Sequence, residues 1–184
     1  VLAGVALLAA GFAARTAFFT AALAGAAFLA GALLPGAFFA GTLAGVGDLV
    51  KTGDGTLALS GISGSFNGVT IIDEGALFVN GSIAASLVQV NDGGTLGGSG
   101  EVGFVTSTGG TIAPGAGLGT LTTMSMTLDS DSVWKFELGA PGVVGSGVND
   151  LLEVDGSLTL ERILEVAPLA GFGAGAYRIV EYTR

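Results

Sequence analysis

One short phrase recurs along most of this chain and constrains its fold more than any other feature. A glycine, a small residue and then leucine or isoleucine occur at Gly55-Thr56-Leu57, Gly75-Ala76-Leu77, Gly94-Thr95-Leu96, Gly110-Thr111-Ile112, Gly119-Thr120-Leu121 and Gly156-Ser157-Leu158. The first four of these phrases are almost evenly spaced, with a slightly shorter interval before Gly110. A recurrence of about 20 residues is typical of a solenoid, in which each coil must stack on its neighbours to bury its apolar face.

Short apolar runs with strict alternation lie between the glycines, for example at 56–60, 88–91, 124–128 and 134–138. A period of two indicates strands with one buried face, and residues 48–184 show no apolar pattern of helical spacing over a useful length. We therefore predict parallel strands stacked rung on rung, with leucine, isoleucine and valine inside and glycine at the corners. An antiparallel sandwich or barrel stays open as the alternative, because short strands separated by glycine turns also suit it.

Residues 1–47 differ in composition from residues 48–184. Arg15 is the sole charged residue of this first part, and residues 16–47 exceed the roughly 20 apolar residues that a membrane helix needs. We expect an apolar, helical segment here. Three interpretations stay open: a signal peptide cut after Ala44, a membrane anchor, or a mis-predicted start of the gene, since the chain begins with valine. The predicted β-helix occupies residues 48–184.

The charged and reactive residues exclude several classes of function. The formal net charge is −9 and the pI is near 4.1, so the chain lacks the basic surface that binds nucleic acid. It contains no cysteine and no histidine. Disulfides, zinc sites and Ser-His-Asp or Cys-His catalysis therefore cannot be assembled from this chain alone.

The phrases in their order carry a resemblance to a known family. Residues 49–61 read Leu-Val-Lys-Thr-Gly-Asp-Gly-Thr-Leu-Ala-Leu-Ser-Gly and resemble the opening of the autotransporter-associated β-strand repeat. Further phrases similar to that family follow at 66–72, 75–82, 94–100, 110–122 and 177–180. The resemblance implies a right-handed parallel β-helix of an autotransporter passenger domain. It also implies export to the cell surface, extracellular space or outer membrane of a Gram-negative bacterium.

The resemblance implies partners as well. Passengers are usually followed by an outer-membrane translocator barrel, on the same polypeptide or a separate one. We expect no such barrel in this chain, and so expect a fragment of a longer protein. A host-surface or carbohydrate ligand is a further expectation, and residues 1–47 would insert into a membrane under the anchor interpretation. The predicted function is structural or adhesive, without catalysis, cofactor or metal.

A β-helix that acts on polysaccharides is the alternative function. Asp129 and Asp131 would share one face of a strand, and a second acidic cluster contains Asn149, Asp150, Glu153 and Asp155. A glycosidase needs carboxyl groups about 5 Å or roughly 6.5–9.5 Å apart across a sugar cleft. We interpret these side chains as solvated turns and assign no catalytic residue. Convergence of Asp129, Asp131, Asp150 and Asp155 on one groove would favour the enzyme.

Four other patterns are interpreted as structural. Residues 97–101 approach a calcium-binding nonapeptide only once and without aspartate, and residues 115–120 lack the lysine and the following helix of a phosphate-binding loop. Residues 80–82 form a sequon that we interpret as a corner. Trp134, Phe136 and Leu138 alternate on one face, and we interpret them as core in preference to an aromatic platform for sugar.

Overall fold

The fold consists of parallel strands joined by turns. The structure is a computed structural model that describes residues 21–23, 28–30, 37–39, 42–115, 117–145, 147–161 and 163–182. Every pairing between its named strands is parallel. Within these ranges we find no helix with the length and apolar character that crossing a membrane requires. The predicted all-β fold of parallel strands is confirmed, and the antiparallel alternative is wrong.

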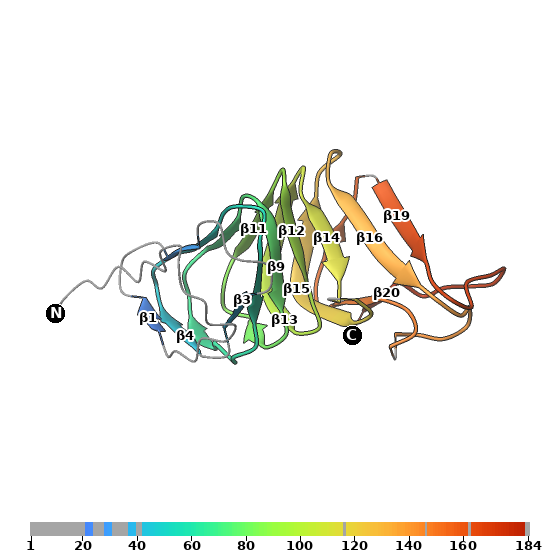
Figure 1. Cartoon of the computed structure of the whole chain (residues 1–184), viewed down its shortest axis with the longest axis horizontal. Helices are drawn as coiled ribbons and strands as arrows, with labels where there is room; N and C mark the ends of the chain where they lie inside the picture. The colour runs from blue at the N-terminus through green and yellow to red at the C-terminus, as the bar shows by residue number, and fades with distance from the viewer. Residues whose placement is uncertain are drawn as a thin grey trace.

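Successive coils of the chain stack along the long axis of the molecule (Figure 1). The first coils visit three sheets in turn, whereas the strands from β8 onward belong to only two of them. The short sheet contains β1 (Ala21–Leu23), β4 (Leu43–Gly45) and β7 (Ser65–Phe66). The long sheet follows the order β2 (Phe28–Ala30), β5 (Leu49–Lys51), β8 (Thr70–Ile72), β11 (Val88–Asn91), β13 (Glu101–Thr108), β15 (Thr120–Leu128), β17 (Leu151–Val154) and β20 (Val180–Tyr182), with β10 (Ser82–Ile83) on β13 and β18 (Leu158–Thr159) on β15. The seven-stranded sheet follows the order β19 (Ile163–Pro168), β16 (Val133–Leu138), β14 (Thr111–Pro114), β12 (Gly94–Gly98), β9 (Gly75–Val79), β6 (Thr56–Leu59) and β3 (Ala37–Phe39).

The register of the seven-stranded sheet reproduces the recurrence in the sequence. Thr56 pairs with Ala76, and Thr95 pairs with both Ala76 and Thr111. Each position of one recurring phrase therefore lies beside the same position of the next phrase. The phrase at 119–121 is different, because it opens β15 in the long sheet. The phrase thus marks a corner before an inward apolar residue, and a corner can lead into either sheet.

The core lies between the long sheet and the seven-stranded sheet. One inward ladder follows the register of the seven-stranded sheet and consists of Leu57, Leu77, Leu96, Ile112 and Trp134, all buried. Burying a large apolar side chain contributes about 1.5–3 kcal/mol relative to leaving it exposed. Because each coil supplies only a few such residues, stability depends on contact with the coils on either side.

Two corners show why glycine recurs. Gly75 has φ +67° and Gly98 has φ +107°, a left-handed conformation that residues with a Cβ rarely adopt. A Cβ at Gly98 would also collide with the backbone of Val79 in the preceding coil, and one at Gly75 would meet the carbonyl oxygen of Gly53. Here glycine permits both the turn and the close approach of neighbouring coils.

The N-terminal segment contains strands where it is described. β1, β2 and β3 pair in parallel with β4, β5 and β6, so they extend the same three sheets by a further coil. The expected helix finds no support in these residues, because their backbone is extended and hydrogen-bonded to the next coil. The remainder of residues 1–41, including Arg15, lies outside the described residues. The interpretations of this segment as signal, anchor or mis-predicted start stay predictions.

Candidate functional site

The acidic residues at 129 and 131 form a turn between coils. The Asp129 carboxylate, at the end of β15, accepts hydrogen bonds from Gly109 N (3.1 Å), Ser132 N (3.0 Å) and Ser132 Oγ (2.7 Å). The hydroxyl of Ser132, followed by the N–H of Gly109, lowers the pKa of Asp129. Asp131 N also donates to Asp129 Oδ1, the oxygen that accepts the other three bonds, at 3.2 Å. The carboxylate therefore stabilises the corner between β15 and β16 and links it to the coil before.

Asp150 has a different structural role. It precedes β17 and is buried, with Oδ1 accepting from Gly119 N (2.9 Å) and Oδ2 from Glu137 N (2.7 Å). Burial raises the pKa of Asp150 to about 6, although both backbone hydrogen bonds favour the ionised form. The carboxylate ties the start of β15, the strand β16 and the start of β17 together. Because each oxygen accepts a backbone hydrogen bond, the carboxylate serves to hold these three strands together.

The four aspartates named by the sequence analysis, at positions 129, 131, 150 and 155, do not converge on one cleft. Asp150 accepts a hydrogen bond from Gly119, just before the start of β15, whereas Asp129 follows the end of that strand. The full length of β15, at about 3.3 Å for each residue, therefore separates the two carboxylates. That length far exceeds the separation of roughly 6.5–9.5 Å in a glycosidase. Asp155 lies on the exposed turn after β17, with its N–H bonded to Thr123 O. This scatter counts against the polysaccharide-acting alternative.

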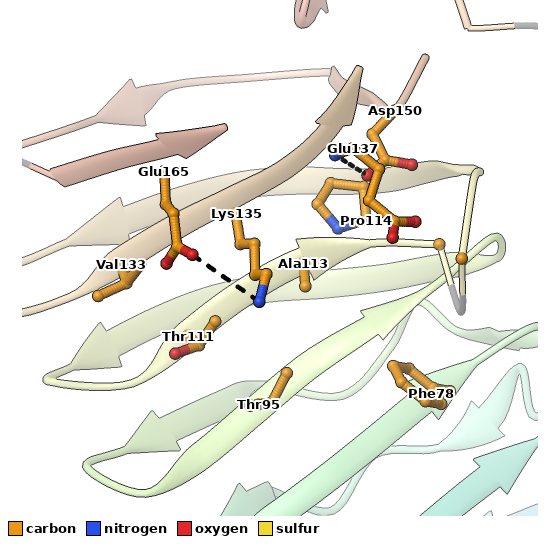
Figure 2. Close-up of a pocket in the computed structure, with 12 residues that line it drawn as sticks. Phe78, Thr95, Thr111, Ala113, Pro114, Val133, Lys135, Glu137, Asp150 and Glu165 are labelled. Atoms are coloured by element: carbon orange, nitrogen blue, oxygen red, sulfur yellow. Dashed lines mark hydrogen bonds and ion pairs between the residues drawn. The ribbon is translucent and has the colours of Figure 1, made fainter. Parts of the chain in front are cut away.

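A shallow groove of about 410 Å³ crosses the outer face of the seven-stranded sheet (Figure 2). We call it the outer groove, and it is lined by Phe78, Thr95, Thr111, Ala113, Pro114, Gly115, Gly117, Val133, Lys135, Glu137, Asp150 and Glu165. Phe78 lies at one side, and Lys135 lies 3.9 Å from Glu165 at the other (Figure 2). The groove thus offers one aromatic ring, hydroxyl groups and charges of both signs on five successive strands. Our sequence analysis missed it, because its residues come from different coils.

Lys51 is a second feature that our sequence analysis did not single out. Its side chain is fully buried, and Nζ donates to the carbonyl oxygens of Thr52 (3.1 Å), Gly53 (2.5 Å) and Glu74 (2.9 Å). Burial lowers the pKa of Lys51, against the attraction of Glu74 and Asp54. The signal was its place in β5, two residues after the buried Leu49, because alternate residues of a strand share a face. The ammonium group joins the corners of two neighbouring coils.

The aromatic trio on β16 is core, as predicted. Trp134, Phe136 and Leu138 are buried, and the rings of Trp134 and Phe136 meet edge to face with centroids 5.5 Å apart. They form no platform on the surface. Trp134 Nε1 is buried and has no hydrogen-bond partner, which is unusual for a buried N–H group.

The remaining motifs are structural where they are described. Asn80 Oδ1 accepts from Ser99 N at 3.1 Å, so the sequon forms a corner between β9 and the coil that follows. The glycine-rich stretch 115–120 leads into strand β15, which fits the rejection of a phosphate-binding loop. In the part of the chain that the structure describes, no three acidic side chains are grouped as metal ligands.

Comparisons with known proteins agree with this fold. Residues 49–78 match the passenger-associated-transport-repeat family. The chain is 43% identical over 152 residues to "Adhesin BmaC autotransporter" of Brucella suis biovar 1 (strain 1330). This match covers 77% of this chain and 4% of the relative. It is also 45% identical over 80 residues to "Extracellular serine protease" of Serratia marcescens. This second match covers 43% of this chain and 8% of the relative. The chain therefore spans less than a tenth of the length of these relatives.

Proposed function

We propose that the chain is a segment of an autotransporter passenger β-helix that carries the autotransporter-associated repeat, and that it acts as a structural and adhesive element without catalysis. Passengers of this kind are exported to the surface or surroundings of Gram-negative cells. The observation that carries the proposal is the unbroken parallel stacking of coils, with an apolar ladder inside and polar groups outside. Such a stack supplies length and a continuous outer face.

We infer further that the coils wind in a right-handed sense, since about 98% of crossovers between parallel strands of one sheet are right-handed. We also infer that a translocator barrel, on the same polypeptide or a separate one, carries the segment to the surface. The division of the chain into an apolar segment, residues 1–47, and a β-helix, residues 48–184, is part of this proposal. So is the choice between cleavage of the apolar segment, its use as an anchor and a mis-predicted start. A cut after Ala44 would divide β4.

Absence of catalysis is proposed on two grounds. The chain has no histidine, so a Ser-His-Asp triad like that of many serine proteases cannot be assembled from it, despite the name of one relative. Asp129 and Asp150 lie at opposite ends of β15, and Asp150 is buried. For the adhesive role, the outer groove supplies the contact surface, because its aromatic ring, hydroxyls and charges can bind a polar ligand such as a carbohydrate.

The first test is the location and N-terminus of the product. The complete gene is expressed in a Gram-negative host, the cells are fractionated, and the product is sequenced by mass spectrometry. We expect it at the surface or in the medium, where added protease can reach it. Recovery from the cytoplasm, or from the inner membrane with residues 1–47 intact, would contradict the proposal.

The second test addresses adhesion. The purified chain is applied to arrays of immobilised polysaccharides and to host cells, beside a Phe78→Ala, Lys135→Ala double variant of the outer groove. We expect the double variant to lose binding, whereas Thr159→Ala, on the exposed strand β18 outside the groove, retains it. Shortening of the polysaccharides during incubation would instead support the enzyme.

A further inference from the structure

The outer groove is a feature of the sheet face, because most of its lining lies on strands that are paired on both sides. β9, β12, β14 and β16 each have a parallel neighbour on either side. Phe78 is in register with Gly97, which is in register with Ala113, and the next strand places Lys135 in the same row. Gly97 and Ala113 are small, so they form a low floor between Phe78 and Lys135. The row spans three strand spacings, or about 14 Å along the axis of the stack.

Free hydroxyl groups lie beside this floor. Thr95 is in register with Thr111, and both side chains are half-buried and line the groove. Within the described residues neither hydroxyl has a hydrogen-bond partner in the protein. A hydroxyl group can donate one hydrogen bond and accept two, so the pair can bind a ligand that carries hydroxyl groups of its own. The backbone of these strands is already paired within the sheet, so a polypeptide on this face could not add a strand.

Phe78 gives one end of the groove an apolar surface. A Cβ on Gly97 would lie 2.8 Å from Cδ1 of the Phe78 ring, so the ring lies close to the glycine and a side chain there would displace it. An aromatic ring beside a few convergent polar groups is the usual composition of a small-molecule site. Sugar rings match this arrangement, because they have an apolar C–H face and hydroxyl groups at their edge.

The charges of the groove do not balance. Its lining contains three carboxylates, on Glu137, Asp150 and Glu165, and one ammonium group, on Lys135, so its net charge is 1 − 3 = −2. Lys135 Nζ lies 3.9 Å from Glu165 Oε1, which leaves the other two carboxylates without a cation. Glu137 N donates to Asp150 Oδ2 at 2.7 Å, so these two residues lie next to each other (Figure 2).

The missing cation matters most at Asp150. This residue is only 1% exposed, and burial raises its pKa to about 6, with a contribution from the charge of Glu137. The Glu137 side chain is half-buried and has no partner among the described residues. A buried carboxylate without a counter-charge is costly, so a ligand that brings a positive charge to this end of the groove is favoured.

We propose that the outer groove binds a linear glycan that carries free amino groups, with its chain along the axis of the stack. One sugar ring packs on Phe78, hydroxyl groups of the glycan bond to Thr95 and Thr111, and an ammonium group binds between Glu137 and Asp150. The same carboxylates repel glycans that carry sulfate or carboxylate groups. The inference rests on the adhesive function proposed above and names the class of ligand that its site takes.

The probes are two oligosaccharides of equal length, one of β-1,4-linked glucosamine and one of the same sugar fully N-acetylated, with heparin as the acidic glycan. Binding to the purified full chain is measured by calorimetry at about pH 6, where the amino groups are largely protonated. We expect the amino form to bind at least about tenfold more tightly than the acetylated form, and heparin not to bind.

Three variants test the assignment. Glu137→Gln keeps the size of the side chain and removes its charge, so the preference for the amino form should fall below about threefold. Glu101→Gln makes the same change on β13 of the long sheet, and the preference should stay. The double variant Thr95→Val, Thr111→Val suits a strand and should weaken binding of both oligosaccharides by at least about tenfold. It tests the groove independently if Glu137→Gln fails to fold.

Equal binding of the two oligosaccharides would overturn the inference, and so would tighter binding of heparin or an unchanged preference in Glu137→Gln. A lysine peptide that binds as tightly as the amino oligosaccharide would assign the groove to a cationic polypeptide and overturn it too. Adhesion to host cells that saturating amino oligosaccharide fails to reduce would reject the inference while the adhesive function stands. Binding of the oligosaccharide without adhesion to any cell would reject the adhesive function instead.

Discussion

The inner coils and the last coil are built from the same residue types but bury them to different extents. Leu77 and Leu96 in the inner coils are fully buried, because strands of the same sheet lie on both sides. Leu164 continues their ladder, yet half of its surface is exposed. The difference shows that the burial of a residue is provided by the neighbouring coils rather than by its own. The same local sequence pattern therefore contributes more to stability in the inner coils than in the last coil.

The two regions also differ in how their corners are held. The coil length is the number of residues between two paired positions, such as Thr56 and Ala76 in the inner coils or Val133 and Ile163 in the last coil. By this measure the last coil is about one and a half times as long as an inner coil. The additional chain between Val133 and Ile163 includes the loop 139–149, and a second loop, 169–179, follows β19. These loops depend on side chains, because Tyr177 Oη donates to Gly139 O at 3.1 Å and Asn149 bonds three backbone groups. The shorter inner corners combine backbone bonds between coils with single side chains such as those of Lys51 and Asn80.

The largest expected effect comes from placing a charge in each region. Leu77→Asp buries an unpaired carboxylate between two coils, and we expect it to lower the free energy of unfolding by at least about 4 kcal/mol or to prevent folding. Leu164→Asp puts the same group on the exposed last coil and should cost about 1 kcal/mol. Urea unfolding followed by circular dichroism measures both. Equal losses would show that the inner ladder is not a more deeply buried core.

The second comparison concerns the two lysines of these regions. Lys51→Ala leaves the carbonyl oxygens of Thr52, Gly53 and Glu74 without their buried donor and opens a cavity, at a cost of about 3 kcal/mol. Lys135→Ala removes the exposed ion pair between Lys135 Nζ and Glu165 Oε1, which are 3.9 Å apart. It should lower the free energy of unfolding by less than about 0.5 kcal/mol. Thermal unfolding of both variants measures the ratio, and a near-neutral Lys51→Ala would refute the role given to the buried ammonium.

A smaller effect is expected at the loop 139–149. Asn149→Ala removes the acceptor for Gly139 N (2.7 Å) and the donors to Ala140 O (2.9 Å) and Val143 O (2.7 Å). We expect a loss of about 2 kcal/mol and faster hydrogen exchange confined to this loop and the adjoining strands. Exchange that accelerates equally in β6 and β9 would mean that the loop and the inner coils unfold as one unit.

The smallest expected effect is a dependence of stability on pH. The folded pKa of Asp150 is about 6, above its ordinary value of 3.8, so the folded state takes up the proton first. The free energy of unfolding should therefore rise as the pH falls from 7 to 5, and this gain is complete below about pH 4. Between pH 7 and 5 the gain is about 1 kcal/mol, because one pKa unit corresponds to about 1.4 kcal/mol and the group titrates only in part over this range. Denaturation at several pH values checks it.

Two comparisons make this measurement specific. Asp150→Asn should abolish the rise between pH 7 and 5, because it removes the titrating group. Asp129 has a lowered pKa, so it stabilises the fold above its ordinary value of 3.8 and loses that effect only at more acidic pH. An unchanged rise in Asp150→Asn would assign the titration to another carboxyl group.

Parts of the fold and of the site were open to prediction from the sequence for a definite reason. The alternation in β6, β11 and β16 and the recurrence of glycine are local patterns that predict strands and corners, and the spacing of about 20 residues favoured parallel stacking. The core role of Trp134 and Phe136 followed in the same way. The strands within residues 1–47 escaped prediction, because alanine, leucine and glycine without charges suit a membrane helix as well as a buried strand.

The sequence by itself determined the strands, the recurring length of the coils and the absence of histidine and cysteine chemistry. Only the tertiary structure decided which coils lie side by side, and so which residues form the outer groove. It also decided that Lys51 and Asp150 are buried, while Leu164 is not. The physical reason is that burial, hydrogen bonding and pKa depend on neighbours from other coils. In a stack these neighbours stand a full coil away in the sequence, as Thr95 does from Thr111 and Met126 from Leu158.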